Sequence, residues 1–398
     1  MKTTIVTTTI YLPELLRVYA KNAKDFGHTD LDFVVIGDRK TPAEVKEFCA
    51  QLNRDFYPTE YMDIEAQRQY LEPRFPELWK HLRFDSIQRR NVGILRAWEN
   101  GADTIITIDD DNWIMNQDFV SLHGRVGRTV DLPTIASTSG WYNVCSLLED
   151  SSNQPFYHRG YPQELRWKDH EAFSTTTFKR VNVAVNAGFW LDDPDIDALT
   201  RMHRTIQVRG WKDSAPGTFA LEPGTWSPFN SQNTGLKRDV IPAYFLSPYI
   251  GRYDDIWASY LVDRIAQHFG EVVAFGDPWV RQKRNPHDYW KDLDAERVGM
   301  RQTDCLCEAL RSIPLTGSSY HECFGQLTSA LPEAWQEGPK WSQLEIDGRN
   351  DLFAGMRIWH EVFQTIQATN TSKLLQSVAA ENHAPATVLQ TETSSVLR

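Results

Sequence analysis

The chain has 398 residues and lacks the long apolar run that a membrane-spanning helix needs. Such a helix takes about 20 consecutive, mostly apolar residues, and no stretch approaches that length. The first residues, Met1–Ile10, also lack the basic, apolar and small-residue succession of a secretory leader. We therefore expect a cytoplasmic protein without a membrane span, in which Met1–Ile10 contributes a first β-strand.

Cysteine and positive charge are also scarce. The five cysteines are odd in number and form no C-x-x-C pair, which argues against a disulfide framework or a zinc site and fits a reducing compartment. Lys and Arg total 42 against 53 Asp and Glu, so the net charge is −11. Because nucleic acids are bound by basic surfaces, we expect no nucleic-acid partner. A phosphorylated small molecule, held by a few arginines and a metal, is compatible with this balance.

What the sequence does contain is an alternation of strands and helices. Short segments rich in β-branched residues predict strands at Thr3–Thr9, Asp32–Ile36 and Thr104–Ile108. Between them, helices are expected at Leu12–Phe26, Pro42–Leu52 and Ser86–Glu99. Strands separated by helices pair in parallel, so the fold class is α/β with a doubly wound sheet that binds its ligand at the carboxyl ends of its strands.

Two local details of these helices are also predicted. Thr41 stands just before Pro42, so it is expected to be the N-cap of the second helix. Ile87, Ile94, Leu95 and Trp98 follow a helical period and are expected to form one apolar stripe.

Three adjacent carboxylates, Asp109–Asp111, follow the strand Thr104–Ile108. If the backbone stays extended, Asp109 and Asp111 face one way and Asp110 the other. Two carboxylates about 4 Å apart repel by roughly 4 kcal/mol at an effective dielectric constant near 20. We therefore expect a divalent cation, Mn²⁺ or Mg²⁺, bridging these acids to a substrate diphosphate. The alternative is a solvated acidic turn.

Arginines and a second acidic pair could complete a site. Asp254 and Asp255 follow Arg252 and precede an amphipathic helix, where they can act as a base or accept a sugar hydroxyl, or merely cap the helix. The loop at Arg159 presents a guanidinium, with Arg166 following. The alternative for both arginines is a turn with surface side chains.

Five segments in a fixed order resemble the reversibly glycosylated polypeptides, glycosyltransferase family seventy-five, which include plant UDP-arabinopyranose mutases and bacterial relatives. The segments are I-D-D-D-N, H-R-G-Y-P-Q-E-L-R, V-A-V-N-A-G-F-W-L-D-D-P-D-I-D-A, G-T-W-S-P-F-N-S-Q-N and I-G-R-Y-D-D-I-W-A. They lie between Thr104 and Asn285, and the run R-N-x-G-I at Arg90 precedes them. The first hundred residues match only in pattern, and the chain after about Asp288 does not align.

The resemblance implies a type A glycosyltransferase fold, that is, a Rossmann-like, mostly parallel central sheet flanked by helices. Residues 1–287 would form the catalytic domain, with a nucleotide-binding half at 1–112 and a sugar-binding half at 113–287. Residues 288–368 are expected to be a helical extension. Residues 369–398 are expected to be a polar tail, which their composition alone would make disordered.

The implied activity is that of an isomerase, a metal-dependent and flavin-independent mutase that interconverts the pyranose and furanose forms of a UDP- or GDP-linked sugar. In the family an arginine, matched here by Arg159, becomes glycosylated. The absence of flavin agrees with the lack of a G-x-G-x-x-G motif at the start of the chain.

The resemblance also implies the residues of the site. The catalytic set is Arg159, Arg166, Asp254 and Asp255. The metal ligands are Asp109, Asp111 and His287, the last being the candidate nearest to a family histidine that is not found at its matching place. The nucleotide-sugar set is Thr8, Asp38, Arg90, Asn91, Asp110, Asn186, Gly188, Trp190, Asn233 and Arg252.

Two other readings stay open at this point. The same nucleotide site would serve a glycosyltransferase that passes the sugar to a separate acceptor, or a non-catalytic partner that only binds the nucleotide sugar. The segment Trp141–Tyr157 differs from the family in content, so the base and the sugar are not decided. We also expect a homo-oligomer.

Overall fold

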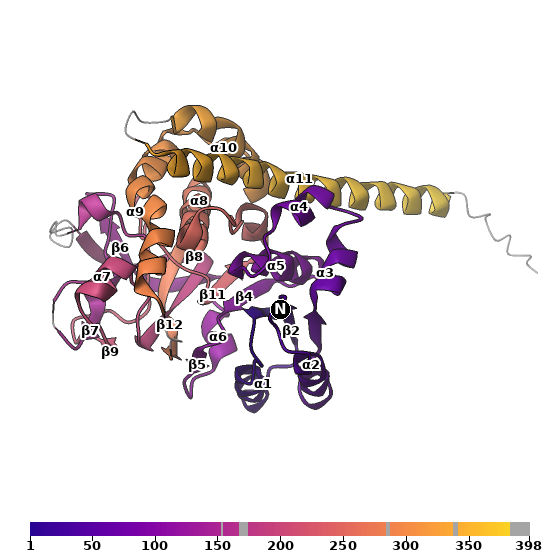
Figure 1. Ribbon diagram of the computed structural model, residues 1–398, viewed down its shortest axis with the longest axis horizontal. Coiled ribbons are helices and arrows are strands. Elements are labelled where there is room, and N and C mark those ends of the chain that lie inside the picture. The colour runs from indigo at the N-terminus through magenta and orange to yellow at the C-terminus, as the bar shows by residue number, and fades with distance from the viewer. Residues whose placement is uncertain (153, 167–173, 284–286, 337–340, 383–398) are drawn as a thin grey trace, which may run out of the picture.

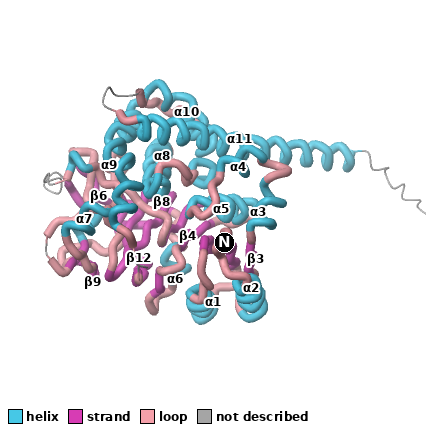
Figure 2. Tube along the Cα trace, viewed as in Figure 1, coloured by secondary structure: helices cyan, strands magenta, loops and turns pink. Residues whose placement is uncertain are grey.

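The computed structural model describes residues 1–152, 154–166, 174–283, 287–336 and 341–382 (Figure 1). A large sheet lies in the middle of the molecule, with helices packed around it (Figure 2). Within these ranges no helix has both the length and the apolar character needed to cross a bilayer. The cytoplasmic location and the oligomeric state stay predictions.

The strands of the sheet are β1 (Thr3–Thr9), β2 (Leu31–Gly37), β3 (Thr59–Met62), β4 (Thr104–Ile108), β5 (Asn112–Ile114), β6 (Thr129–Ser137), β7 (Leu148–Asp150), β8 (Ser174–Asp192), β9 (Val208–Trp211), β10 (Phe219–Leu221), β11 (Asn233–Lys237) and β12 (Glu271–Gln282). The helices are α1 (Leu15–Asp25), α2 (Glu44–Asp55), α3 (Ile64–Leu71), α4 (Pro76–His81), α5 (Arg90–Glu99), α6 (Phe119–His123), α7 (Ala198–His203), α8 (Asp254–His268), α9 (Tyr289–Ser312), α10 (Tyr320–Ala334) and α11 (Gln343–Asn382).

The first four strands are parallel, in the order β3-β2-β1-β4. Every residue of β1 and β4 is buried, as expected for parallel strands covered on both faces. In this register Thr9 lies beside Gly37, and Thr7 lies beside Ile108. The strand order changes direction between β1 and β4, which is where open α/β sheets bind their ligands. The segments after β1, β2 and β4 therefore meet at one edge.

The rest of the sheet mixes strand directions. β11 runs antiparallel to both β4 and β8, whereas β12 is parallel to β8 and antiparallel to β5 and β10. The parallel part predicted from the sequence is thus the Rossmann-like first half, and β11 joins it to a mixed second half. This arrangement is the α/β, type A glycosyltransferase-like architecture that the sequence predicts, and a helical C-terminal region follows it.

Two details of the predicted helices are wrong. Helix α2 begins at Glu44, after Ala43, because the Thr41 hydroxyl is used elsewhere: it donates to the carbonyl of Thr9 (2.6 Å) and accepts from the amide of Asp38 (2.7 Å). It thereby joins the loop after β2 to the end of β1.

Ile87 is the second correction. It belongs to a separate 3₁₀ turn, Ile87–Arg89, and its side chain is 43% exposed, so it does not continue the buried stripe of α5. The backbone leaves the helical register before Arg90, and this places the turn at the sheet edge where β1, β2 and β4 end.

Helix α11 fastens the C-terminal region to both halves of the sheet domain. The indole of Trp359 is fully buried and donates to the carbonyl of Ile241 (3.3 Å). Phe363 packs edge-to-face on Trp98, with ring centroids 4.9 Å apart. In Figure 1 this helix passes α4, and its last turns extend beyond the body. It continues to Asn382, into the segment expected to be a tail, and residues 383–398 lie outside the described part.

We expect Trp359→Ala to destabilise the protein strongly, because a fully buried ring would leave a cavity between α11 and the sheet domain. Such truncations lower the free energy of unfolding by about 3–5 kcal/mol. The matched control is Leu344→Ala on the same helix, which is 48% exposed and should change this free energy by less than about 0.5 kcal/mol. Thermal and urea unfolding would measure both, and equal midpoints for the two variants would contradict the fastening role of α11.

Candidate active site

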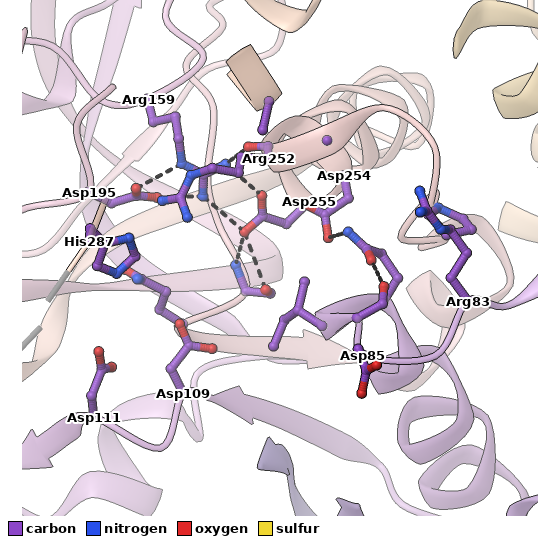
Figure 3. Close-up of a pocket in the computed structure, with 18 of the residues that line it drawn as sticks. Arg83, Asp85, Asp109, Asp111, Arg159, Asp195, Arg252, Asp254, Asp255 and His287 are labelled. Atoms are coloured by element: carbon purple, nitrogen blue, oxygen red, sulfur yellow. Dashed lines mark hydrogen bonds and ion pairs between the residues drawn. The ribbon is translucent and has the colours of Figure 1, made fainter. Parts of the chain in front are cut away.

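Two adjoining cavities lie at the edge where β1, β2 and β4 end. The larger cavity has a volume of about 510 Å³ and is drawn in Figure 3, and the smaller one has a volume of about 210 Å³. Both are lined by Asp85, Ser86 and Ile87, so this segment is a wall that they share. The two cavities are therefore adjacent, with this segment between them.

The smaller cavity is lined by residues from the ends of the parallel strands. Thr8 comes from β1, Asp38 follows β2, and Asp110 follows β4. The Asp110 carboxylate accepts a hydrogen bond from the Thr9 hydroxyl (2.8 Å), and burial raises the pKa of this carboxyl. Three residues of the predicted nucleotide-sugar set are thus brought together.

The acidic triplet divides between the two cavities. Asp109 and Asp111 line the larger cavity and Asp110 the smaller one, as predicted, although the backbone turns at Asp110 and Asp111 and does not stay extended. Asp109 forms an ion pair with Arg90 (2.5 Å), a fully buried side chain that also donates to the carbonyl of Ser231 (2.8 Å). Arg90 therefore stands behind the cavity wall and orients Asp109.

The predicted metal ligands line one cavity without forming a closed site. His287 lines the larger cavity, where its Nδ1 lies 2.9 Å from the carboxylate of Asp292. In Figure 3 the carboxylates of Asp109 and Asp111 lie below His287. Across the described ranges, no three His, Cys, Asp or Glu side chains gather closely enough to hold an ion. Two carboxylates on one wall still fit Mg²⁺ or Mn²⁺, which are commonly bound by one or two carboxylates plus substrate phosphates.

The centre of the larger cavity is a buried arginine held between two carboxylates. Arg159 is 5% exposed. Its Nε and Nη2 donate to Asp195 (2.8 and 2.9 Å), and its Nη1 and Nη2 donate to Asp255 (3.1 and 3.3 Å). Nη1 also donates to the carbonyl of Arg252. These contacts engage all five N–H donors of a guanidinium.

Charge fixes the protonation of this arginine. Burial acts against the charged guanidinium, but the carboxylates of Asp195 and Asp255 outweigh it and hold the pKa of Arg159 well above its usual value. Arg159 is therefore cationic throughout the physiological range, and it keeps both carboxylates in place.

The two carboxyls at the start of α8 lie in different environments. Asp255 is bound to Arg159 and also accepts from the amide of Ser231 (3.1 Å). Asp254 accepts from the side-chain amide of Gln88 (3.0 Å), and burial together with the charge of Asp255 raises its pKa to about 7. Neither side chain caps α8. The pair thus offers one carboxylate and one group that titrates near neutrality.

Arg252 stands at the rim of the larger cavity. Its Nε donates to Glu296 (3.0 Å), and its Nη1 lies 3.4 Å from Asp292. Asp292 also contacts His287, so the side chains of Arg252 and His287 are both held by residues of α9.

Arg166 and Asn91 are buried but do not line either cavity. Arg166 forms an ion pair with Asp197 (2.5 Å) beneath the loop that carries Arg159. Asn91 binds the backbone of Leu246 through both its carbonyl and its amide, which fixes α5 against the segment between β11 and α8.

The residues predicted from the V-A-V-N-A-G-F-W segment and from the segment that ends at Asn233 lie within strands β8 and β11 and do not line either cavity. Asn186 and Asn233 both contact the buried ring of His123 (3.0 Å each). A Cβ at Gly188 would lie 2.2 Å from the Asn233 amide, and Trp190 is buried against other rings. In this structure these four residues position the β8–β11–β12 part of the sheet.

Sequence reasoning missed several residues that line the larger cavity. Asp195 is the most important of them, because it shares Arg159 with Asp255. It lies within a segment used for the family resemblance, but as one of several acids there its partner could be found only from the fold. Gln88 contacts Asp254 and Ser231 contacts Asp255, and in both pairs the two residues are more than twenty positions apart in the sequence. No local pattern in the sequence indicates such contacts.

Comparison with known proteins supports the resemblance. The model of the family described as "Reversibly glycosylated polypeptide" matches residues 75–337, about two thirds of the chain. UDP-arabinopyranose mutase 1 of Arabidopsis thaliana is 25% identical over 237 residues, which are 58% of this chain and 62% of that protein. Probable UDP-arabinopyranose mutase 1 of Zea mays is 28% identical over 243 residues, and the match covers 58% of this chain and 60% of that protein. The chain thus spans about three fifths of the length of these relatives.

Similarity to solved structures is weaker. Glucosyl-3-phosphoglycerate synthase from Mycobacterium tuberculosis, in complex with Mn²⁺ and UDP-glucose, has a TM-score of 0.39 at 10% identity and covers 79% of this chain and 81% of its own. A mannosyltransferase from Pyrobaculum calidifontis, in complex with GDP-Man and Mn²⁺, has a TM-score of 0.35 at 10% identity and covers 94% and 87%. Both scores are too low to transfer a ligand or an activity.

The five ordered segments, the cavity that residues of all five segments line and the family match over about two thirds of the chain agree with one another. The chain belongs to the reversibly glycosylated polypeptide family.

Proposed function

We propose that this chain is an isomerase, a metal-dependent mutase that interconverts the pyranose and furanose forms of a nucleotide sugar. The observation that carries the proposal is the pair of adjoining cavities with different chemistry. The smaller one suits a nucleoside, and the larger one holds both the acids for a diphosphate-bound ion and a buried Arg–Asp cluster for the sugar. The names of the curated relatives support the same activity.

In this proposal Asp109 and Asp111 are the residues that would hold a divalent ion together with the diphosphate. When bound, Mn²⁺ or Mg²⁺ supplies charge that stabilises the diphosphate as it leaves the sugar. Arg90 keeps Asp109 in place from behind. The cationic rim at Arg252 adds to the positive potential on the same side of the cavity.

Ring contraction needs the bond between the anomeric carbon and the diphosphate to break and re-form while two sugar hydroxyls exchange places. Asp254, with a pKa of about 7, is suited to transfer protons in this reaction. Its carboxylate takes the proton from the hydroxyl that enters the ring and returns it to the oxygen that leaves the ring.

The contacts of Arg159 argue against a role in binding the diphosphate. A clamp on the diphosphate would need a spare donor, and all five donors are engaged by protein groups. We propose instead that Arg159 is the residue that holds the sugar between the two bond changes. As the bond from the anomeric carbon to the diphosphate oxygen breaks, a bond from Nη2 of Arg159 to that carbon would form, and Nη2 would release one proton to Asp195 or Asp255, which already accept from it.

The first test is product analysis. A mutase converts a nucleotide sugar alone into an isomeric nucleotide sugar, whereas a glycosyltransferase releases free nucleotide only when an acceptor is present. The protein and Mn²⁺ are incubated with a panel of UDP- and GDP-sugars, and new furanose anomeric signals are sought by NMR. Release of nucleotide without an isomer would overturn the proposal.

We expect Asp111→Ala to abolish turnover and the metal-dependent part of nucleotide-sugar binding, because one of two carboxylates facing the diphosphate is lost. Calorimetry with Mn²⁺ and with EDTA measures this dependence. Asp213→Ala, an exposed acid, is the matched control and should behave as the wild type. Binding by Asp111→Ala that tightens with Mn²⁺ as in the wild type would contradict the assignment.

We expect Arg159→Lys to lower kcat by roughly a hundredfold or more, since an ammonium cannot donate to both Asp195 and Asp255 in the fork geometry of a guanidinium. Exposed Arg180→Lys is the control. Mass spectrometry of the wild type after incubation with substrate should show one added sugar on the peptide that contains Arg159. Normal turnover by the lysine variant would refute the role.

The pH dependence follows from Asp254. Its pKa is raised to about 7, so the carboxylate form is lost below that pH, and kcat should rise with pH through about 7 and then level off. Asp254→Asn should remove this inflection. Gln88→Leu deletes the amide that helps the carboxylate form and should move the inflection to higher pH. A wild-type profile that stays flat from pH 6 to 8 would argue against Asp254 as the proton carrier.

A further inference from the structure

Arg89 is a buried cation at the smaller cavity that the protein only partly satisfies. Its side chain is 1% exposed and lines the cavity with Asp38 and Asp110. Its Nε donates to the side-chain carbonyl of Gln67 (2.7 Å). Among the described residues, neither Nη1 nor Nη2 has a hydrogen-bond acceptor. Unlike Arg159, this guanidinium therefore has its outer donors unused.

The guanidinium is fixed in place by its surroundings. It lies between two aromatic rings, with its central carbon 5.1 Å from the centroid of Trp79 and 4.7 Å from that of Phe84. Gln67, which holds Nε, is itself tied to the carbonyls of Gly37 (2.7 Å) and Met62 (2.8 Å). Packing on both faces and a bound Nε leave the two outer nitrogens fixed and buried at the wall of the smaller cavity, without an acceptor among the described residues.

Such a group is costly to the folded protein unless something in the cavity accepts from it. Burial lowers the pKa of Arg89 to about 10, with the charge of Asp38 acting in the opposite direction, so the side chain stays cationic at neutral pH. An apolar side chain would fill the space between Trp79 and Phe84 without this cost. The arrangement therefore points to a ligand that presents a pair of acceptors.

We propose that Arg89 selects a guanine base, whose O6 and N7 accept from its two outer nitrogens. The inference rests on the proposed function, in which the smaller cavity holds the nucleoside. In protein–DNA complexes, an arginine donating to the O6 and N7 of guanine is the commonest specific contact to a base edge, and the same geometry is open to a free nucleotide. Asp38 lines the same cavity and supplies a carboxylate of the kind that accepts from the N1–H and the 2-amino group of guanine.

The other bases match this edge less well. Uracil has two carbonyl acceptors, O2 and O4, but the N3–H donor lies between them, so no adjacent pair of acceptors is offered to the two arginine nitrogens. Adenine places an amino donor next to N7, and that donor would face the cation. This chain is thus assigned a GDP-sugar, although the curated relatives are named as UDP-arabinopyranose mutases.

The experiment is calorimetric titration of the full chain, in Mn²⁺, with GDP, UDP, ADP and 7-deaza-GDP. GDP should bind at least about tenfold more tightly than UDP or ADP, since a site built to donate to a base discriminates against bases that lack the acceptors. 7-Deaza-GDP differs from GDP only by the loss of the N7 acceptor, and it should bind about tenfold more weakly than GDP.

Variants localise the effect. Arg89→Gln should bind GDP and 7-deaza-GDP equally, because the donor pair is gone. Arg96→Gln is the matched control: it lies on the neighbouring helix, pairs with Glu60 and should keep the wild-type preference. Should Arg89→Gln fail to fold, the comparison of GDP with 7-deaza-GDP on the wild type decides the matter without a mutation.

The outcomes are distinct. UDP binding as tightly as GDP, or 7-deaza-GDP binding as tightly as GDP, overturns the assignment of the base while leaving the nucleotide site intact. Binding of none of the four diphosphates overturns the proposed function itself, and the inference about guanine falls with it.

Discussion

The bonds between Arg159 and the carboxylates of Asp195 and Asp255 are the interaction on which the larger cavity depends. Removing two carboxylates and a guanidinium from water is costly, and it is tolerated only where geometry and further hydrogen bonds compensate. That compensation continues through the protein: Asp255 accepts from Ser231, and Ser231 accepts from Arg90, which holds Asp109. A line of polar contacts therefore joins the sugar end of the site to the acidic triplet.

Two neighbouring acids show how environment sets chemistry. Asp254 and Asp255 are adjacent in sequence, and both are buried. Asp255 is bound to a cation, whereas Asp254 accepts from the neutral side-chain amide of Gln88 and lies beside a like charge. A carboxyl such as Asp254, whose pKa burial and a like charge raise to about 7, is typical of sites that move protons.

The strands of the first half could be predicted because runs of β-branched residues such as Thr3–Thr9 strongly favour the β conformation. The position of Asp109–Asp111 at the sheet edge could also be predicted, because these acids directly follow a buried strand. The prediction for Thr41 was wrong, because its hydroxyl forms a tertiary contact in place of a helix cap. Family motifs indicated segments more reliably than individual roles. Asn186 and Asn233 lie in such segments and brace the sheet, while Asp195 contacts Arg159 and had no assigned part. Side-chain pairings across long sequence separations are not encoded in local patterns.

The shared wall at Asp85, Ser86 and Ile87 has a consequence for how such a protein diversifies. Because the same short turn leads into Gln88 and Arg89, the partner of the titrating carboxyl and the cation of the smaller cavity are adjacent residues. A lineage that acquires a different nucleoside specificity by remodelling this turn also shifts the amide beside Asp254. A change of nucleotide-sugar substrate in this architecture is therefore expected to require compensating substitutions in the larger cavity, rather than a single substitution in the smaller one.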